Sequence, residues 1–329
     1  MSEPKTYTLD VPGAGLSYDV READASTKPV LLIIGSPMGA AGFATLAGHF
    51  GDRTVVTYDP RGAERSHRSA STAEITPDQH ADDLHRLIEA LDAGPVDIFA
   101  SSGGAVNALV LVAQHPEQVR TLVADEPPAS AEVPDREPVL AACHDIRSTY
   151  VSSGFGPAMA KFIKLVSYEG PLPADYVSQP APDPAMFGLP ADDDGSRDDA
   201  LMANMVACND HQHDFGALRR ASTRVVIGVG TDSGQQLAGR AGLPVAERLG
   251  IAPTSSPVAT TGSWAASTAA WASRTSSPPP CARCWTADPG LSADLGPENR
   301  PAEVNLFRAV RATVWVWTGA RATRRCWPP

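Results

Sequence analysis

Residues 96–105, with the sequence VDIFASSGGA, decide the fold of this chain. The first five residues form a largely apolar run that suits a strand buried in a sheet, and residues 105–114 continue as an apolar helix. Ser102 lies between the two, on the kind of sharp strand-to-helix turn that exposes a hydroxyl above a sheet. The spacing therefore predicts a nucleophile elbow with Ser102 at its apex.

The residues around this turn favour Ser102 over its neighbour Ser101. An elbow forces the nucleophile into a strained conformation, so the residues two positions before and after it must be small. Ser102 has Ala100 and Gly104 at those positions, whereas Ser101 would have Phe99. A glycine-rich helix start in another α/β fold is the alternative interpretation of this stretch.

Strands and helices alternate on both sides of the elbow. Residues 5–21 predict two strands joined by a Pro-Gly turn, and Thr76 with Pro77 suits the start of a helix. Further strands are predicted at 29–34, 53–58, 96–100, 119–124 and 224–229, and helices at 40–50, 78–92, 105–114 and from residue 233 to 249. This alternation predicts βαβ units and a doubly wound, mostly parallel sheet, which is an α/β fold.

The alternation stops at Pro127 and resumes at Arg224. Residues 129–218 contain three helical stretches, around 136–150, 157–167 and 199–207, separated by connectors rich in Pro and Asp. We expect a helical cap inserted over the sheet. The predicted organisation is therefore a first core part at 1–128, the cap at 129–218, a second core part at 219–253, and an anomalous segment at 254–329.

A second turn follows an early strand and is a candidate for oxyanion binding. Ile34 to Gly39, with the sequence IGSPMG, ends the apolar strand. A backbone N–H from this turn could form an oxyanion hole together with the N–H of Gly103, the residue after the candidate nucleophile. Ser36 is the first choice for this donor and Met38 the second, and an ordinary strand-to-helix turn is the alternative.

Three motifs together resemble the α/β-hydrolase superfamily over about residues 5–252. They are I-G-S-P-M at 34–38, D-P-R-G at 59–62 and A-S-S-G-G at 100–104, in the order that the family shows. The resemblance implies serine nucleophile chemistry on an ester, lactone, amide or similar acyl substrate. Ile34 stands where many members have His, and Ala100 where many have Gly. Members that open epoxides or remove halides use an Asp nucleophile, which Ser102 argues against.

The resemblance also implies a triad in the order Ser, acid, His. Asp232, after the strand at 224–229, is the first candidate for the acid, and Asp125 or Glu126 is the alternative. The eight His residues lie at 49, 67, 80, 85, 115, 144, 211 and 213, so none follows Asp232. His211 or His213 could act as the base only if their loop bent into the site. Without a base, Ser102 is a weak nucleophile.

The composition changes sharply near Pro253. All six Trp residues lie beyond it, and residues 255–329 carry eight Arg against four acidic residues, although the whole chain has a net charge of −11. One permitted back-translation of residues 255–287 contains, in another frame, a strand end, a His-His-Gly loop and an amphipathic helix. We therefore hypothesise a frameshift near residues 253–255. A genuine extension or interaction tail is the alternative.

Composition also limits the classes of function. The acidic balance argues against a nucleic-acid partner, and no stretch is apolar enough for a membrane span. The N-terminus lacks the apolar core of a signal peptide, so we expect a cytoplasmic protein. No cofactor or metal is expected, because the CxxC at 281–284 has no second pair. The expected partner is a small acyl substrate. The alternatives are a non-catalytic binding protein and a cofactor-free perhydrolase or haloperoxidase.

Overall fold

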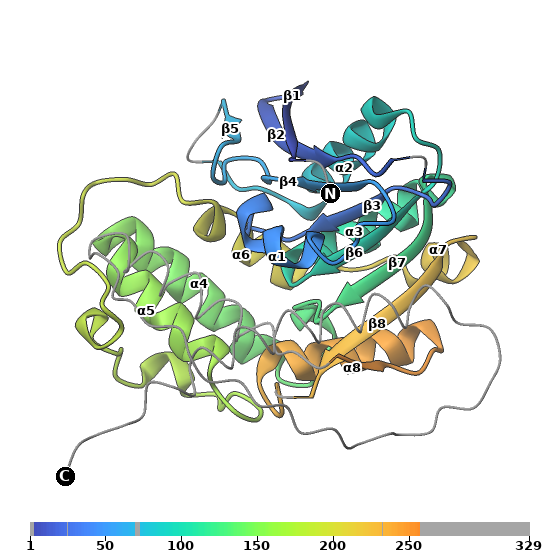
Figure 1. Ribbon diagram of the computed structural model, residues 1–329. Helices are drawn as coiled ribbons and strands as arrows, with labels where there is room; N and C mark the ends of the chain where they lie inside the picture. Colours follow the sequence, from blue (N-terminus) through green and yellow to red (C-terminus); the bar gives the residue numbers. More distant parts are fainter. Residues whose placement is uncertain (1–2, 25, 70–72, 232, 257–329) are drawn as a thin grey trace, which may run out of the picture.

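The structure is a computed structural model that describes residues 3–24, 26–69, 73–231 and 233–256 (Figure 1). Its described residues form one sheet with the order β1-β2-β4-β3-β6-β7-β8-β9, and β5 pairs with β2. The strands are β1 (Lys5–Val11), β2 (Ala14–Arg21), β3 (Leu31–Ile34), β4 (Val55–Tyr58), β5 (His67–Arg68), β6 (Val96–Ser101), β7 (Val119–Asp125), β8 (Arg224–Gly230) and β9 (Thr254–Ser256).

The sheet has the mostly parallel, doubly wound form that the sequence predicts. β1 and β2 form an antiparallel hairpin, β2 is antiparallel to β4, and the neighbours from β4 to β9 are parallel. The helices are α1 (Ala44–Ala47), α2 (Pro77–Leu91), α3 (Gly103–Gln114), α4 (Arg136–Ser153), α5 (Phe155–Val166), α6 (Ala200–Asp210), α7 (Phe215–Arg220) and α8 (Leu237–Leu249). No helix within the described ranges is long and apolar enough to cross a bilayer.

The central strands are apolar on both faces because helices cover both. Alternate residues of a strand point to opposite sides, so Leu32 and Ile34 join one apolar cluster with α2, α3, α7 and α8. Leu31 and Ile33 join another with the segment around α1. The helix predicted at 40–50 is shorter than expected. Residues 40–43 form a 3₁₀ turn and α1 has only four residues, because Gly39, Gly42 and Gly48 make this segment a poor helix former.

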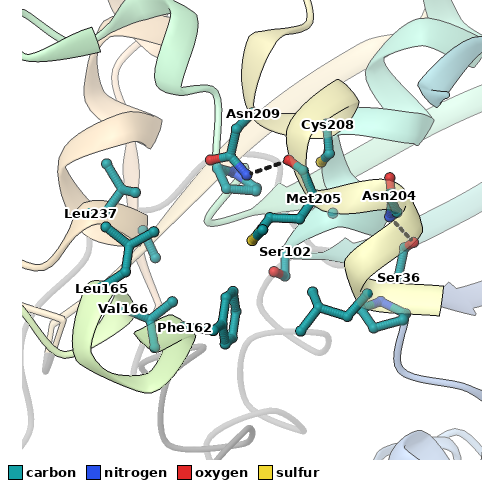
Figure 2. A pocket seen from close by; sticks show the side chains of 15 residues that line it. Ser36, Ser102, Phe162, Leu165, Val166, Asn204, Met205, Cys208, Asn209 and Leu237 are labelled. Atoms are coloured by element: carbon teal, nitrogen blue, oxygen red, sulfur yellow. Dashed lines mark hydrogen bonds between the residues drawn. The ribbon is translucent and has the colours of Figure 1, made fainter. Parts of the chain in front are cut away.

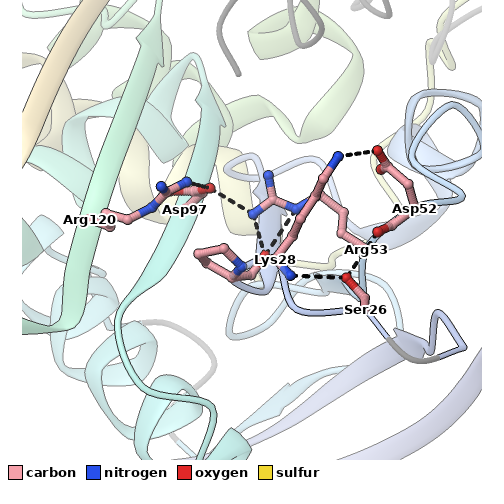
Figure 3. A network of polar contacts seen from close by, with 7 residues as sticks. Ser26, Lys28, Asp52, Arg53, Asp97 and Arg120 are labelled. Atoms are coloured by element: carbon pink, nitrogen blue, oxygen red, sulfur yellow. Dashed lines mark hydrogen bonds and ion pairs between the residues drawn. The ribbon is translucent and has the colours of Figure 1, made fainter. Parts of the chain in front are cut away.

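Two polar features fix this frame. The predicted start of α2 is confirmed, since Thr76 accepts the N–H of Gln79 and the Gln79 side chain accepts the N–H of Thr76. Near the start of β6, Asp97 binds both Arg53 and Arg120, so one carboxylate joins the segment before β4 to β6 and β7 (Figure 3). This network lies at the opposite end of β6 from Ser102.

Residues between β7 and β8 contain α4, α5 and α6, close to the three helices that the sequence predicts. They share an apolar core that includes Cys143, Ile146, Met159 and Met205. Figure 1 shows α4 and α5 beside the end of the sheet toward which the arrowheads of β7 and β8 point. These helices therefore stand next to the carboxyl ends of the parallel strands, where α/β folds bind ligands.

The sequence pattern does not predict β9. Its three residues pair in parallel with the end of β8, with Ser256 opposite Gly230. They are Thr and Ser, so no apolar run marks the strand, and its backbone pairing with β8 determines its position. The sheet therefore extends past Pro253. From residue 257 onward, the predicted anomalous segment lies outside the described residues.

Candidate active site

Ser102 occupies the predicted turn between β6 and α3. Its φ is +56° and its ψ is −129°, a conformation that residues other than Gly rarely adopt. Two backbone hydrogen bonds hold it there: the Ser102 N–H donates to the Asp125 carbonyl at 3.0 Å, and the Ser102 carbonyl accepts from the Ala105 N–H at 2.8 Å. The strained conformation of Ser102 is thus maintained by β7 on one side and α3 on the other.

The turn after β3 lies directly against this elbow. A Cβ atom placed on Gly104 would lie 2.8 Å from Gly35 Cα, and one on Gly103 would lie 2.7 Å from the Ser36 carbonyl oxygen. Both distances are too short for a real side chain. The two glycines are therefore required for the close approach of the two turns, and this approach brings Ser36 next to Ser102.

A cavity of about 80 Å³ opens above Ser102 (Figure 2). Ser102, Gly103, Ser36 and Pro37 contribute to its wall, with residues of α5, α6 and α8 opposite. The remaining lining residues are mostly apolar: Pro128, Phe162, Leu165, Val166, Leu201, Asn204, Met205, Cys208, Asn209, Leu237 and Ala238. None of the described residues on this wall is charged, and none is His. The cavity is suited to a small, uncharged and largely apolar group.

Most of this wall could not be predicted from the sequence. Ser36, the first choice for the oxyanion donor, lies on it, but Met38, the second choice, does not. Met38 instead packs beside the core around Phe43. Asn204 and Cys208 were missed, because no local signal shows which face of α6 turns toward the elbow. Burial raises the pKa of the Cys208 thiol to about 12.

Among the acid candidates, Asp125 ends β7 and Glu126 follows it, whereas Asp232 is outside the described residues. Glu126 is fully buried, with a φ of +49°, and its Oε1 accepts the Gly230 N–H at 2.9 Å and the Ser233 hydroxyl. Neither Asp125 nor Glu126 lines the cavity. The Glu126 carboxylate therefore joins the end of β7 to the end of β8 and to Ser233.

All eight His residues are described, and none lines the cavity. His213 packs edge-on against His211 and Phe215, and burial lowers the pKa of His213 to about 3. Burial also lowers the pKa of His211, while the charge of Asp78 opposes this effect. Neither ring lines the cavity at Ser102. Within the described ranges, no group of three or more His, Cys, Asp or Glu side chains is placed to hold a metal ion.

Comparison with known proteins agrees with the fold described above. The sequence family described as the α/β hydrolase fold matches residues 28–183. An uncharacterized hydrolase, YraK, from Bacillus subtilis is 40% identical over 121 residues, which are 36% of this chain and 44% of the relative. A proline iminopeptidase from Heyndrickxia coagulans is 27% identical over 127 residues, 37% of this chain and 43% of the relative. The chain thus matches less than half the length of each of these relatives.

Solved structures show the same fold. A hydrolase from Pseudomonas aeruginosa has a TM-score of 0.56 and 18% identity, and the match covers 83% of this chain and 98% of that one. An enol-lactonase from Burkholderia xenovorans has a TM-score of 0.56 and 16% identity, with coverage of 82% and 98%. From the sheet order and these matches, we conclude that the chain has the α/β-hydrolase fold.

Proposed function

We propose that this protein is a serine-dependent hydrolase of a small ester-like or other acyl substrate with an apolar acyl group. The observation that carries the proposal is the strained Ser102 at the wall of an uncharged cavity, directly beside Ser36 and Gly103. Strain at a non-glycine residue persists only where the surrounding structure holds it, and such positions cluster at functional sites.

In the proposed reaction, Ser102 Oγ attacks the carbonyl carbon of the substrate. The carbonyl oxygen becomes an oxyanion that accepts the backbone N–H groups of Gly103 and Ser36. The C–O or C–N bond to the leaving group then breaks, and water hydrolyses the acyl-serine. Asp232 would orient the base that takes the Ser102 proton, and Glu126 would hold the loop of Asp232. Helices α4 to α6 would form the cap that excludes water.

The base is the missing member of this site. None of the eight His residues lines the cavity at Ser102, and the loss of a triad member typically costs several orders of magnitude in rate. We therefore propose that the chain as written is impaired, and that a frameshift near residues 253–255 accounts for the missing His. Resequencing the gene tests this directly: an intact frame that runs into the same tail, without an insertion or deletion against related genes, would refute it.

The activity is tested with p-nitrophenyl butyrate, whose butyryl group suits the small apolar cavity. We expect slow hydrolysis by the chain as written and much faster hydrolysis by the chain with its frame restored. Ser102→Ala should abolish both activities. The matched control is Ser101→Ala, because Ser101 is the adjacent serine and does not line the cavity. Equal hydrolysis rates for the wild type and Ser102→Ala would refute the proposal that this polypeptide is a serine-dependent enzyme.

A non-catalytic binding protein is the second candidate. The observation that favours it is the uncharged, His-free wall of the cavity among the described residues. In that case the wild type and Ser102→Ala would bind apolar ligands equally well, and the chain with its reading frame restored would show no hydrolysis. Measuring both properties on the same two variants separates the candidates.

A further inference from the structure

Two buried serine–asparagine pairs anchor α6, and they differ in the direction of the hydrogen bond. Ser130 Oγ donates to Asn209 Oδ1 at 2.6 Å, so the hydroxyl hydrogen of Ser130 is used. In the other pair, Asn204 Nδ2 donates to Ser36 Oγ at 2.8 Å, so Ser36 is the acceptor. A hydroxyl carries one hydrogen and two lone pairs. In this orientation of the Asn204 amide, the hydrogen of Ser36 has no acceptor among the described residues, and Asn204 Oδ1 is likewise buried without a hydrogen-bond partner.

The position of Ser36 shows where this hydrogen could be used. Ser36 is 5% exposed and Asn204 3%, so bulk water hardly competes for either group. The Ser36 Cβ lies 3.4 Å from the position of a Cβ on Gly103, and Ser36, Gly103 and Ser102 line the same cavity (Figure 2). A buried donor without an acceptor is unfavourable, and such groups in native structures call for an explanation.

We propose that the Ser36 hydroxyl is a side-chain donor to the oxyanion, in addition to the backbone N–H groups, and that Asn204 is the residue that positions it. The inference rests on the proposed function of Ser102. Asn204 Nδ2 occupies one lone pair of Ser36 Oγ, which turns the hydroxyl hydrogen away from α6. A hydrogen bond to a charged oxygen is stronger than one to a neutral carbonyl, so this donor stabilises the transition state more than the ground state.

The test uses n-butylboronic acid and the full-length chain at pH 8, and it does not require turnover. Ser102 Oγ donates an electron pair to the trigonal boron and forms an O–B bond. The Ser102 proton leaves to the buffer, and the product is a tetrahedral boronate anion that mimics the oxyanion intermediate. Boron NMR detects the change from trigonal to tetrahedral geometry and gives the dissociation constant. Ser102→Ala should form no adduct.

Four variants then test the role of the hydroxyl. Ser36→Ala keeps the backbone N–H and should weaken adduct formation roughly 10- to 100-fold, whereas Ser36→Thr keeps a hydroxyl and should retain most of the affinity. Asn204→Asp replaces the donor by an acceptor that captures the Ser36 hydrogen. It should therefore weaken binding as much as Ser36→Ala, and the two changes together should add nothing further. Ser130→Ala, which breaks the other buried pair, is the matched control and should change the affinity less than twofold.

The outcomes separate this proposal from the one on which it rests. No Ser102-dependent adduct in the wild type would overturn both. An adduct that Ser36→Ala leaves within twofold would overturn only the role of the Ser36 hydroxyl, and so would an equal loss in Ser130→Ala. Competition by n-pentane, which has an apolar chain and no hydrogen-bonding group, should be unchanged in Ser36→Ala. A parallel loss of n-pentane binding would indicate damage to the cavity and would also overturn the assignment.

Discussion

Gly104 gives the sharpest test of the contact between the two turns. In Gly104→Ala, the new Cβ would lie 2.8 Å from Gly35 Cα and 2.9 Å from Gly35 C. Ordinary carbon contacts begin near 3.4 Å, so the two backbones must separate by roughly half an ångström. Neither group is a flexible side-chain end that could rotate away. Overpacking of this kind costs about 1–3 kcal/mol, and the better helix propensity of Ala offsets about 1 kcal/mol or less.

We therefore expect Gly104→Ala to lower the free energy of unfolding by about 1–2 kcal/mol, measured by urea denaturation monitored by circular dichroism. The matched control is Gly216→Ala at the start of α7. Its Cβ would meet only the ends of the Asp214 and Arg220 side chains, at 3.1 and 3.3 Å. This control should be neutral or stabilising. If Gly104→Ala were as stable as the wild type, the two turns would not be in the close contact described above, and the geometry of Ser36 beside Ser102 would be refuted.

Three further predictions concern buried polar groups. Asp83 is fully buried, and both of its carboxylate oxygens bind Arg61, so Arg61→Met leaves Asp83 without its counter-charge. Urea denaturation should show that the free energy of unfolding falls by about 3–5 kcal/mol. A decrease below about 1 kcal/mol would contradict this. Burial lowers the pKa of His80 from 6.5 to about 3. As the pH falls from 6.5 toward 3, His80 therefore takes up a proton in the unfolded chain but not in the folded chain. The free energy of unfolding therefore decreases over that pH range. His80→Leu should reduce the slope of the unfolding free energy against pH by about 1.4 kcal/mol per pH unit. An unchanged slope between pH 6 and 4 would show that His80 is not the group whose protonation destabilises the fold. Burial raises the pKa of the Cys208 thiol to about 12. At pH 8, methyl methanethiolsulfonate should therefore label Cys208 at least about 1000-fold more slowly than free cysteine, as measured by peptide mass spectrometry. Comparable labelling rates would refute this burial.

The parts of the fold that follow from local patterns could be predicted from the sequence. The buried strands are short apolar runs, and α2 has its own capping residues, so both appear in a single window of sequence. The elbow could also be located, because Ala100 and Gly104 are the small neighbours that such a turn requires. What the window does not show is that Gly104 faces Gly35, a residue from a different turn.

The parts that depend on contacts between distant segments could not be predicted. Asn204 lies 168 residues from Ser36 in the chain, and only the packing of α6 over the elbow brings the two together. Met38 and Ser36 could not be distinguished by spacing alone, since the choice depends on which residue faces the cavity. β9 has no apolar signature at all. Its place is determined by the pairing of its backbone with β8.

The helix α8 belongs to two apolar clusters at once. Its first turns, with Leu237 and Ala241, complete the core of α4 to α6, whereas Val245, Ala246 and Leu249 pack under the sheet. The inserted helices are therefore not a module that could be grafted between homologues by cutting at the ends of β7 and β8. A chimera with a foreign insertion would leave Leu237 facing unmatched side chains, so a successful exchange must also redesign the amino-terminal half of α8.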